Sequence, residues 1–292
     1  MNGSPSLVSG RSSDGLPTIG VFDSGFGGLT VLKALLEVIP DAEYLYFGDT
    51  ARLPYGSKSV ETVARYACEA ARFLEQQGAE LLVIACNTAT ALALEQIRAA
   101  ASVPVVGVIE PGARRAAEAA SSKSRRVVVI GTEATISSHA YQRALAALKI
   151  EAREKACPLL VPLVEEGWVE HPVTEQVVKV YLGEVFDGFG GADVLLLGCT
   201  HYPLLKPVLQ RVVPEGVTLV DSAEATALAV QSLVGSGSVN VRQVSKRGPS
   251  EKEIPSAQMR FFVTDSAEKF RRLGARFLGQ EIRDIRHVDL KE

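Results

Sequence analysis

The segment LLVIACNTATALALEQIRAA (residues 81–100) decides the fold class of this chain. Its first five residues are continuously apolar, which is typical of a strand buried on both faces of a parallel sheet. The remaining residues place apolar side chains at three- and four-residue spacing, which predicts an amphipathic helix. Because a buried strand that leads into a helix is half of a β–α–β unit, the segment predicts an α/β protein with a parallel sheet.

The same alternation of short apolar runs and helical patterns continues along most of the chain. Residues 59–78 and 137–149 carry further helical patterns. Short apolar runs predict buried strands at 18–22, 44–47, 81–85, 105–109, 127–130, 159–164, 194–198 and 217–220. Ligands of such folds bind outside the carboxyl ends of the strands, so the residues that follow each strand are the candidates for a site.

The chain also looks doubled. One half opens with the strand TIGVF (18–22) and reaches Cys86 at the end of a later strand. The other half opens with VVVI (127–130) and reaches Cys199 after a similar length of chain. We therefore expect two similar flavodoxin-like parallel-sheet domains that face each other across a cleft and bring both cysteines to it.

Composition excludes several other classes of protein. The 292 residues allow one large domain or two ordinary ones. The chain has 31 Lys and Arg against 34 Asp and Glu, which gives a net charge of −3. Without an excess of basic residues to bind phosphates, a nucleic-acid-binding protein is not expected. No apolar run reaches about 18 residues, and residues 1–16 lack the apolar stretch of a secretory signal. We expect a soluble, cytoplasmic protein without a membrane partner.

Only four cysteines occur, and none forms a CxxC pair or a short Cys/His spacing, so neither a disulfide scaffold nor a metal site is expected. A helix N-terminus lowers the pKa of a cysteine thiol placed at the end of a strand, as Cys86 and Cys199 are. The alternative is that both are small buried apolar residues. Their equivalent positions favour function, whereas Cys68, within a helical pattern, and Cys157, before Pro158 and an expected strand, fit packing.

Further polar residues follow the expected strands. The segment DSGFGGLT (23–30) lacks the glycine and lysine pattern of a phosphate loop, but its glycines and Ser24 suit an anionic ligand. Asp23 fits either a base or a simple helix N-cap. His201 is close enough in sequence to exchange a proton with Cys199. Glu165, at the expected end of the strand 159–164, fits either a site residue or a solvated turn.

Two opposed thiols with acid–base neighbours favour stereoinversion at a carbon acid. One thiolate removes the Cα proton from one face, and the other thiol delivers a proton to the opposite face. A cysteine hydrolase would leave one of the two cysteines idle. A disulfide reductase needs its two thiols close in sequence or on a flexible segment, and Cys86 and Cys199 do not fit this pattern.

The motifs, taken in order, resemble the glutamate racemase family. They are VFDSGFGGLTVL, YFGDTARLPYGSKS, IACNTATA, GVIEPGA, VIGTEATISSHAYQRAL, ACPLLVPLVEEGW, LLGCTHYPLL, VDSAEATA and, near the C-terminus, FFVTDSAEKFRRLGARFLG. The resemblance implies a racemase without cofactor or metal that interconverts L- and D-glutamate and supplies D-glutamate for peptidoglycan.

The same resemblance implies a role for each matching residue. Cys86 would remove the proton from D-glutamate with help from Asp23, and Cys199 would remove it from L-glutamate with help from His201. Glu165 would be a further polar residue of the catalytic group. The implied substrate contacts are Asp23, Ser24, Tyr55, Gly56, Asn87, Thr88, Thr200 and His201, with Thr132 and Thr135 as weaker candidates.

The resemblance also implies how the chain is divided. The first α/β domain would comprise 17–112 and 223–292, and the second would comprise 113–222. Polar composition predicts a disordered tail at 1–16 and a loop at 235–258. A homodimer is expected. Two alternatives stay open: an aspartate or hydantoin racemase of the same fold, and a catalytically idle ligand-binding protein, against which the presence of both cysteines argues.

Overall fold

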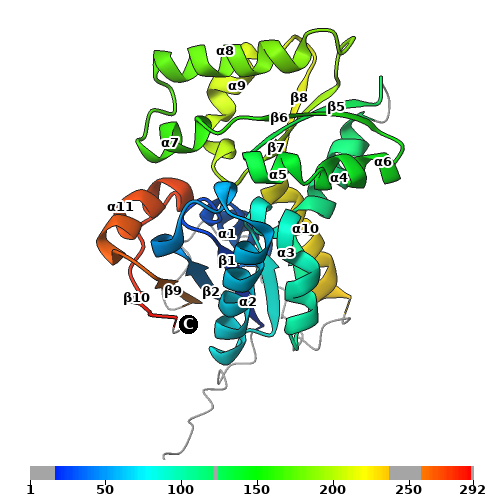
Figure 1. The fold of residues 1–292 in the computed structure, drawn as a ribbon. Coiled ribbons are helices and arrows are strands. Elements are labelled where there is room, and N and C mark those ends of the chain that lie inside the picture. The colour runs from blue at the N-terminus through cyan, green and yellow to red at the C-terminus, as the bar shows by residue number, and fades with distance from the viewer. Residues whose placement is uncertain (1–16, 121–123, 237–257, 291–292) are drawn as a thin grey trace, which may run out of the picture.

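Two parallel sheets, each flanked by helices, make up the protein (Figure 1). The structure is a computed structural model and describes residues 17–120, 124–236 and 258–290. In the view of Figure 1 the larger sheet and its helices form the lower half of the molecule, which we call the first half. The smaller sheet and its helices form the upper half, which we call the second half. All strand pairs of both sheets are parallel.

The lower sheet has six strands in the order β10-β9-β2-β1-β3-β4. These strands are β1 (Thr18–Asp23), β2 (Glu43–Gly48), β3 (Leu81–Ile84), β4 (Val105–Gly107), β9 (Met259–Val263) and β10 (Ile285–His287). The helices of this half are α1 (Leu29–Val38), α2 (Val60–Gln76), α3 (Asn87–Ala100), α10 (Ser222–Gly235) and α11 (Ala267–Leu278), with short 3-10 turns at Thr50–Arg52 and Tyr55–Ser57. Because every residue of β1 is buried, this strand lies at the centre of the core.

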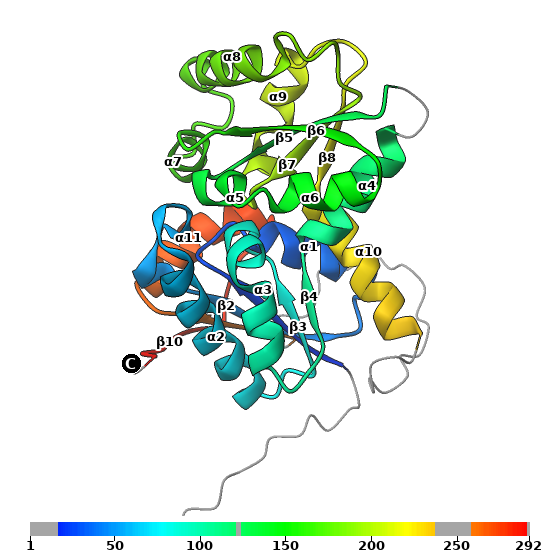
Figure 2. The same cartoon turned by 45° about the vertical axis from the view of Figure 1, so that its right-hand side comes forward.

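The upper sheet has four strands in the order β6-β5-β7-β8. They are β5 (Arg126–Gly131), β6 (Glu151–Ala156), β7 (Val194–Gly198) and β8 (Thr218–Asp221). Its helices are α4 (Ile109–Ala120), α5 (Glu133–Ser137), α6 (Ala140–Ala147), α7 (Leu160–Glu165), α8 (Pro172–Phe186) and α9 (Lys206–Val212), with a 3-10 turn at Tyr202–Leu205. Helices α4 and α10 pack together where the two halves meet (Figure 2).

The strand order confirms the predicted doubling. In both sheets the first strand of the repeat lies between the second and the third, and the fourth lies beside the third. Cys86 follows the third strand of one repeat (β3), and Cys199 follows the third strand of the other (β7). The fold class is therefore the expected pair of flavodoxin-like domains, with β9 and β10 added to the first sheet beyond β2.

One of the predicted elements is wrong, and two others have different bounds from those predicted. The run 159–164 is not a strand, because residues 160–165 form helix α7, and the strand that pairs with β5 is β6. The predicted strand 105–109 ends at Gly107, since α4 begins at Ile109. The predicted helix 137–149 is interrupted at His139, whose left-handed backbone conformation separates α5 from α6.

The predicted tail 1–16 and residues 237–257 of the predicted polar loop lie outside the described residues. The division of the chain at 112/113 and 222/223 stays a prediction, and α4 runs across the first of these points. Within the described part of the chain, no helix is long and apolar enough to cross a membrane.

Candidate active site

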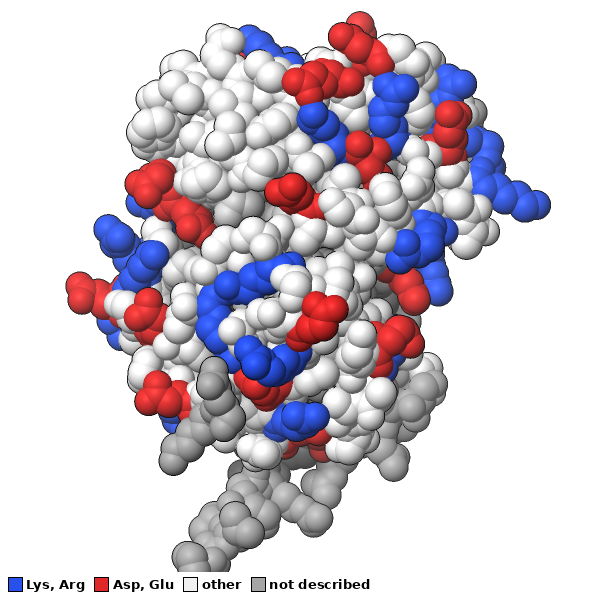
Figure 3. Space-filling view, viewed as in Figure 1, with Lys and Arg blue, Asp and Glu red and all other residues white. Residues whose placement is uncertain are grey.

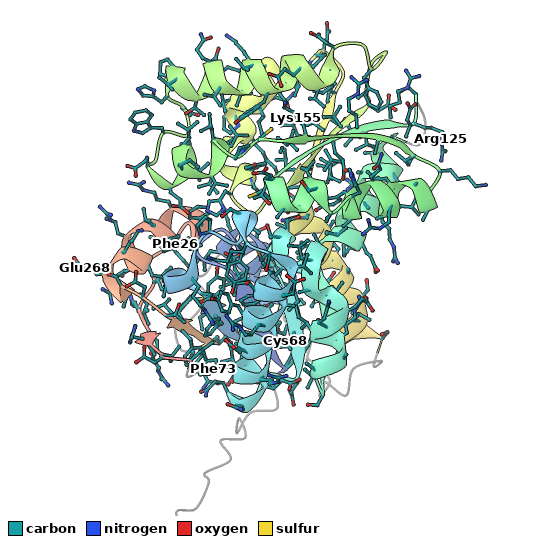
Figure 4. The ribbon with its side chains drawn as sticks, viewed as in Figure 1. Phe26, Cys68, Phe73, Arg125, Lys155 and Glu268 are labelled. Atoms are coloured by element: carbon teal, nitrogen blue, oxygen red, sulfur yellow. The ribbon has the colours of Figure 1, made fainter. Side chains whose placement is uncertain are left out.

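A cavity of about 380 Å³ lies between the two halves, and residues of both line it. Most of the predicted site residues meet there: Ser24, Tyr55, Gly56, Cys86, Asn87, Thr88, Thr132, Glu165, Cys199, Thr200 and His201. Asp23 and Thr135 do not line the cavity, but both are fully buried next to residues that do. Cys68 lies on α2, in the lower half and away from this cavity (Figure 4).

Cys86 lies where β3 ends and α3 begins. Its Sγ caps the helix by accepting a hydrogen bond from the Ala89 N–H at 3.4 Å, and it donates to Ser24 Oγ at 3.5 Å. Burial and, to a smaller extent, the nearby Asp23 together raise the pKa of the Cys86 thiol to about 12. The expected lowering by the helix N-terminus is outweighed, so without substrate Cys86 holds its proton at neutral pH.

Asp23 lies at the end of β1, behind Cys86. Its Oδ2 accepts a hydrogen bond from the Gly25 N–H at 2.9 Å, whereas Oδ1 has no hydrogen-bond partner among the described residues. Burial raises the pKa of this carboxyl, although His201 and the N–H groups of Gly25 and Gly28 oppose the shift. A carboxyl with a raised pKa and a free oxygen suits proton exchange with a neighbouring group.

Cys199 has a different set of neighbours, on the opposite wall of the cavity. Its Sγ lies 3.9 Å from His201 Nδ1, and His201 Nε2 lies 3.2 Å from Glu165 Oε1. Burial lowers the pKa of His201, but the hydrogen bonds to Cys199 and Glu165 raise it more, to about 10. The cysteine, histidine and glutamate therefore form a chain along which a proton can be held beside Cys199.

The rest of the cavity lining combines neutral polar groups with apolar side chains, which are those of Leu53, Pro54, Pro158, Val161 and Pro162. Three hydroxyls meet across the two halves: Thr88 Oγ1 lies 2.9 Å from Thr132 Oγ1 and 3.2 Å from Thr135 Oγ1. The Tyr55 hydroxyl donates to Asp49, a fully buried carboxylate that also accepts from Arg52. These contacts fix the direction in which each donor faces.

The charge of the cavity is small. In the described part of the chain no Lys or Arg lines it, and its ionisable residues are Tyr55, Glu133, Glu165, His201 and the two cysteines. The same part contains no cluster of His, Cys, Asp or Glu that could hold a metal ion. Hydroxyl, amide and backbone N–H groups are therefore what the cavity offers to an anionic ligand.

Comparison with known proteins agrees with this geometry. The family model described as Asp/Glu/Hydantoin racemase matches residues 20–230. The chain belongs to this racemase family. The family resemblance drawn from the motifs is confirmed, and the protein is an amino-acid racemase, an isomerase.

Similar proteins are glutamate racemases. The glutamate racemase of Koribacter versatilis is 59% identical over 94% of this chain and 98% of its own length. Among solved structures, the Bacillus anthracis glutamate racemase isoform RacE1 is 37% identical, with a TM-score of 0.83 over 94% of this chain and 98% of its own. The Francisella tularensis glutamate racemase in complex with D-glutamate is 36% identical, with a TM-score of 0.82 over 95% and 98%.

Several residues that line the cavity were not predicted from the sequence. Leu53, Pro54, Ser57, Glu133, Pro158, Val161 and Pro162 also line the cavity. All seven lie inside the sequence motifs that resemble the racemase family, and this is the signal that could have identified them. Asp49 has a different position, since it contacts Tyr55 rather than the cavity. Glu165, placed at a strand end by the sequence, is instead the last residue of α7.

The charge of His201 gives a test of the contacts in this candidate site. Because its pKa in the folded chain is raised from 6.5 to about 10, we expect NMR to find the imidazolium still protonated at pH 8 to 9. This protonation stabilises the fold fully below pH 6.5, and the stabilisation is lost as pH rises through 10. Glu165→Gln removes one of the two raising contacts and should lower the His201 pKa. If His201 of the unmodified chain titrates near 6.5, the contacts with Cys199 and Glu165 do not control its charge.

Proposed function

We propose that this racemase interconverts L- and D-glutamate by a two-base proton transfer at Cα. The supporting observation is that Cys86 and Cys199 line one cavity from opposite halves, each after the third strand of its repeat. Inversion needs one group on each face of the carbon, and this arrangement supplies a thiol on each side. No cofactor enters the proposal.

In this mechanism the Cys199 thiolate removes the Cα proton of L-glutamate while the Cys86 thiol donates its proton to the opposite face. One S–H bond forms, one breaks, and the product is D-glutamate with the charge transferred to Cys86. The reverse reaction exchanges the two roles. Asp23 assists Cys86, and His201, held by Glu165, assists Cys199.

The groups proposed to bind the substrate are Ser24, Tyr55, Gly56, Asn87, Thr88, Thr200 and His201, with Asp23 beneath them and Thr132 and Thr135 beside them. Neutral donors bind two carboxylates by hydrogen bonds, and closure of the two halves around the substrate would keep water away from the developing carbanion. Glutamate is favoured over aspartate because the similar proteins above are glutamate racemases, one of them solved with D-glutamate.

The test is to incubate the protein with L-glutamate in D₂O and to follow both the Cα proton signal and the optical rotation. We expect the rotation to fall to zero while deuterium replaces the Cα proton. A parallel incubation with L-aspartate distinguishes the two substrates. Unchanged L-glutamate would exclude the proposed activity. If only L-aspartate is racemised, the protein is an aspartate racemase instead.

Two wider proposals rest on the family resemblance. The D-glutamate formed would supply peptidoglycan synthesis in the cytoplasm. A homodimer would cover exposed apolar side chains of the second half, where Leu159, Trp168, Val173 and Val180 are 44% to 60% exposed. Figure 3 shows a surface with few charged groups in the region of α7 and α8, which fits a protein contact.

A further inference from the structure

Tyr141, which the proposed mechanism does not use, is fully buried between the two cysteine sites. It lies in the first turn of α6, in the second half of the molecule. Its ring packs against Gly198, the residue before Cys199: a Cβ added to Gly198 would lie 2.9 Å from Tyr141 Cε2. The ring therefore touches the strand end that carries one of the two cysteines.

The hydroxyl of Tyr141 reaches the other cysteine site. It donates a hydrogen bond to Asn87 Oδ1 at 2.6 Å, and Asn87 directly follows Cys86. Asn87 is 2% exposed and lines the cavity. One tyrosine of the second half thus holds a cavity residue of the first half.

The Tyr141 hydroxyl is the donor in this hydrogen bond. Burial raises the pKa of Tyr141, so its hydroxyl keeps its proton. A phenol has one proton. At 2.6 Å that proton is donated to Asn87 Oδ1, so Asn87 presents its oxygen, and not its NH₂ group, to Tyr141.

The other end of the Asn87 amide is left without a partner. Asn87 Nδ2 is buried and has no hydrogen bond among the described residues. A buried donor without a partner costs about 1–3 kcal/mol. A carboxylate bound in the cavity would accept from this group, whereas the amide oxygen in the same place would repel it.

We propose that Tyr141 is a positioning residue, which locks the Asn87 amide with its NH₂ group available to a substrate carboxylate. The proposal rests on the proposed function, since the carboxylate is that of glutamate. Tyr141, on α6 of the second half, thereby connects that half to a cavity residue of the first half.

The test is Tyr141→Phe, which removes the hydroxyl but keeps the ring against Gly198. We expect KM for glutamate to rise about 5- to 30-fold, the equivalent of one hydrogen bond, with kcat within about twofold of the unmodified enzyme. In an Asn87→Ala background the same change should have no further effect, because the two residues act through one contact.

Tyr44→Phe is the matched control. Tyr44 is 1% exposed, and its hydroxyl donates to Ile39 O at 2.8 Å, far from the cavity lining. It should lower the free energy of unfolding as Tyr141→Phe does and leave KM unchanged. An unchanged KM in Tyr141→Phe, or effects of Tyr141→Phe and Asn87→Ala that simply add, would overturn the positioning role.

A second measurement separates this role from the proposed function. Without substrate, the side-chain NH₂ signals of Asn87 should form one sharp pair in the unmodified protein and broaden in Tyr141→Phe. Identical signals in the two proteins would overturn the positioning role whatever the substrate is. An unmodified enzyme that leaves glutamate unchanged but shows the expected signals would refute the proposed function alone.

Discussion

Cys86→Ser and Cys199→Ser are each expected to lower kcat/KM for glutamate racemisation by about 10²- to 10⁴-fold, the usual contribution of a positioned acid or base. A serine hydroxyl is a much weaker acid than a thiol, so it neither removes the Cα proton nor returns one efficiently. Both cysteines are about 5% exposed and line the same cavity, and serine fits in place of either. The loss is therefore chemical, with little change in the fold.

The two cysteines are distinguished by isotope exchange. L- and D-glutamate have equal free energies in water, so kcat/KM must fall equally in both directions for any variant. In D₂O, however, Cys86→Ser keeps Cys199 and should exchange the Cα proton of L-glutamate faster than it inverts it. Cys199→Ser should do the same with D-glutamate.

Cys68→Ser is the control for these variants, because Cys68 lies on α2 outside the cavity (Figure 4) and should keep full activity. Full racemisation by either Cys86→Ser or Cys199→Ser would contradict the two-base mechanism. Exchange of both enantiomers at equal rates in one variant would contradict the assignment of one cysteine to each face.

The sequence predicted the fold well where strands are apolar on both faces. It failed at β6, whose residues EAREKA include four charged side chains and form no apolar run. This strand lies at the edge of its sheet and is only partly buried, so pairing with β5 holds it in place without a hydrophobic signal. The run LLVPLV was assigned instead, although Pro162 within it argues against a central strand.

The site was predictable because its residues follow strands, and parallel strands bring their carboxyl ends to one edge. Contacts between distant segments of the chain could not be predicted in this way. Asp49 and Tyr141, for example, contact residues that line the cavity but do not line it themselves. The protonation state of Cys86 also could not be predicted from the sequence. Position at a helix start is visible in a sequence, whereas the burial that raises its pKa is not.

The glycine-rich segment after β1 gives the second large expected effect. Gly27 lies against the second half of the molecule: an added Cβ would be 2.2 Å from Thr200 Oγ1 and 2.6 Å from His201 Nδ1. Thr30 in the same segment donates to Thr200 O at 3.2 Å, and Phe277 of α11 packs edge-on to His201 with ring centroids 5.3 Å apart. The first half thus holds the residues that follow Cys199.

Gly27→Ala should therefore push Thr200 and His201 away from Cys199. A displacement of about 1 Å at a catalytic group costs about 100-fold in rate, so we expect kcat/KM to fall by about that factor. Crowding of a packed interior should also lower the free energy of unfolding by about 1–3 kcal/mol. Steady-state kinetics and urea unfolding of the same preparation measure the two effects.

Gly183→Ala is the matched control, because Gly183 lies exposed in α8 with no atom within 4 Å of an added Cβ. It should stabilise the protein by about 0.5–1 kcal/mol and leave kcat/KM unchanged. If Gly27→Ala keeps wild-type activity, the approach of the first half does not position His201. A fall in stability with unchanged kcat/KM would mean that Gly27 acts in packing alone. A fall in both stability and kcat/KM, together with a His201 pKa that moves away from 10, would connect the packing of the two halves to proton transfer at Cys199.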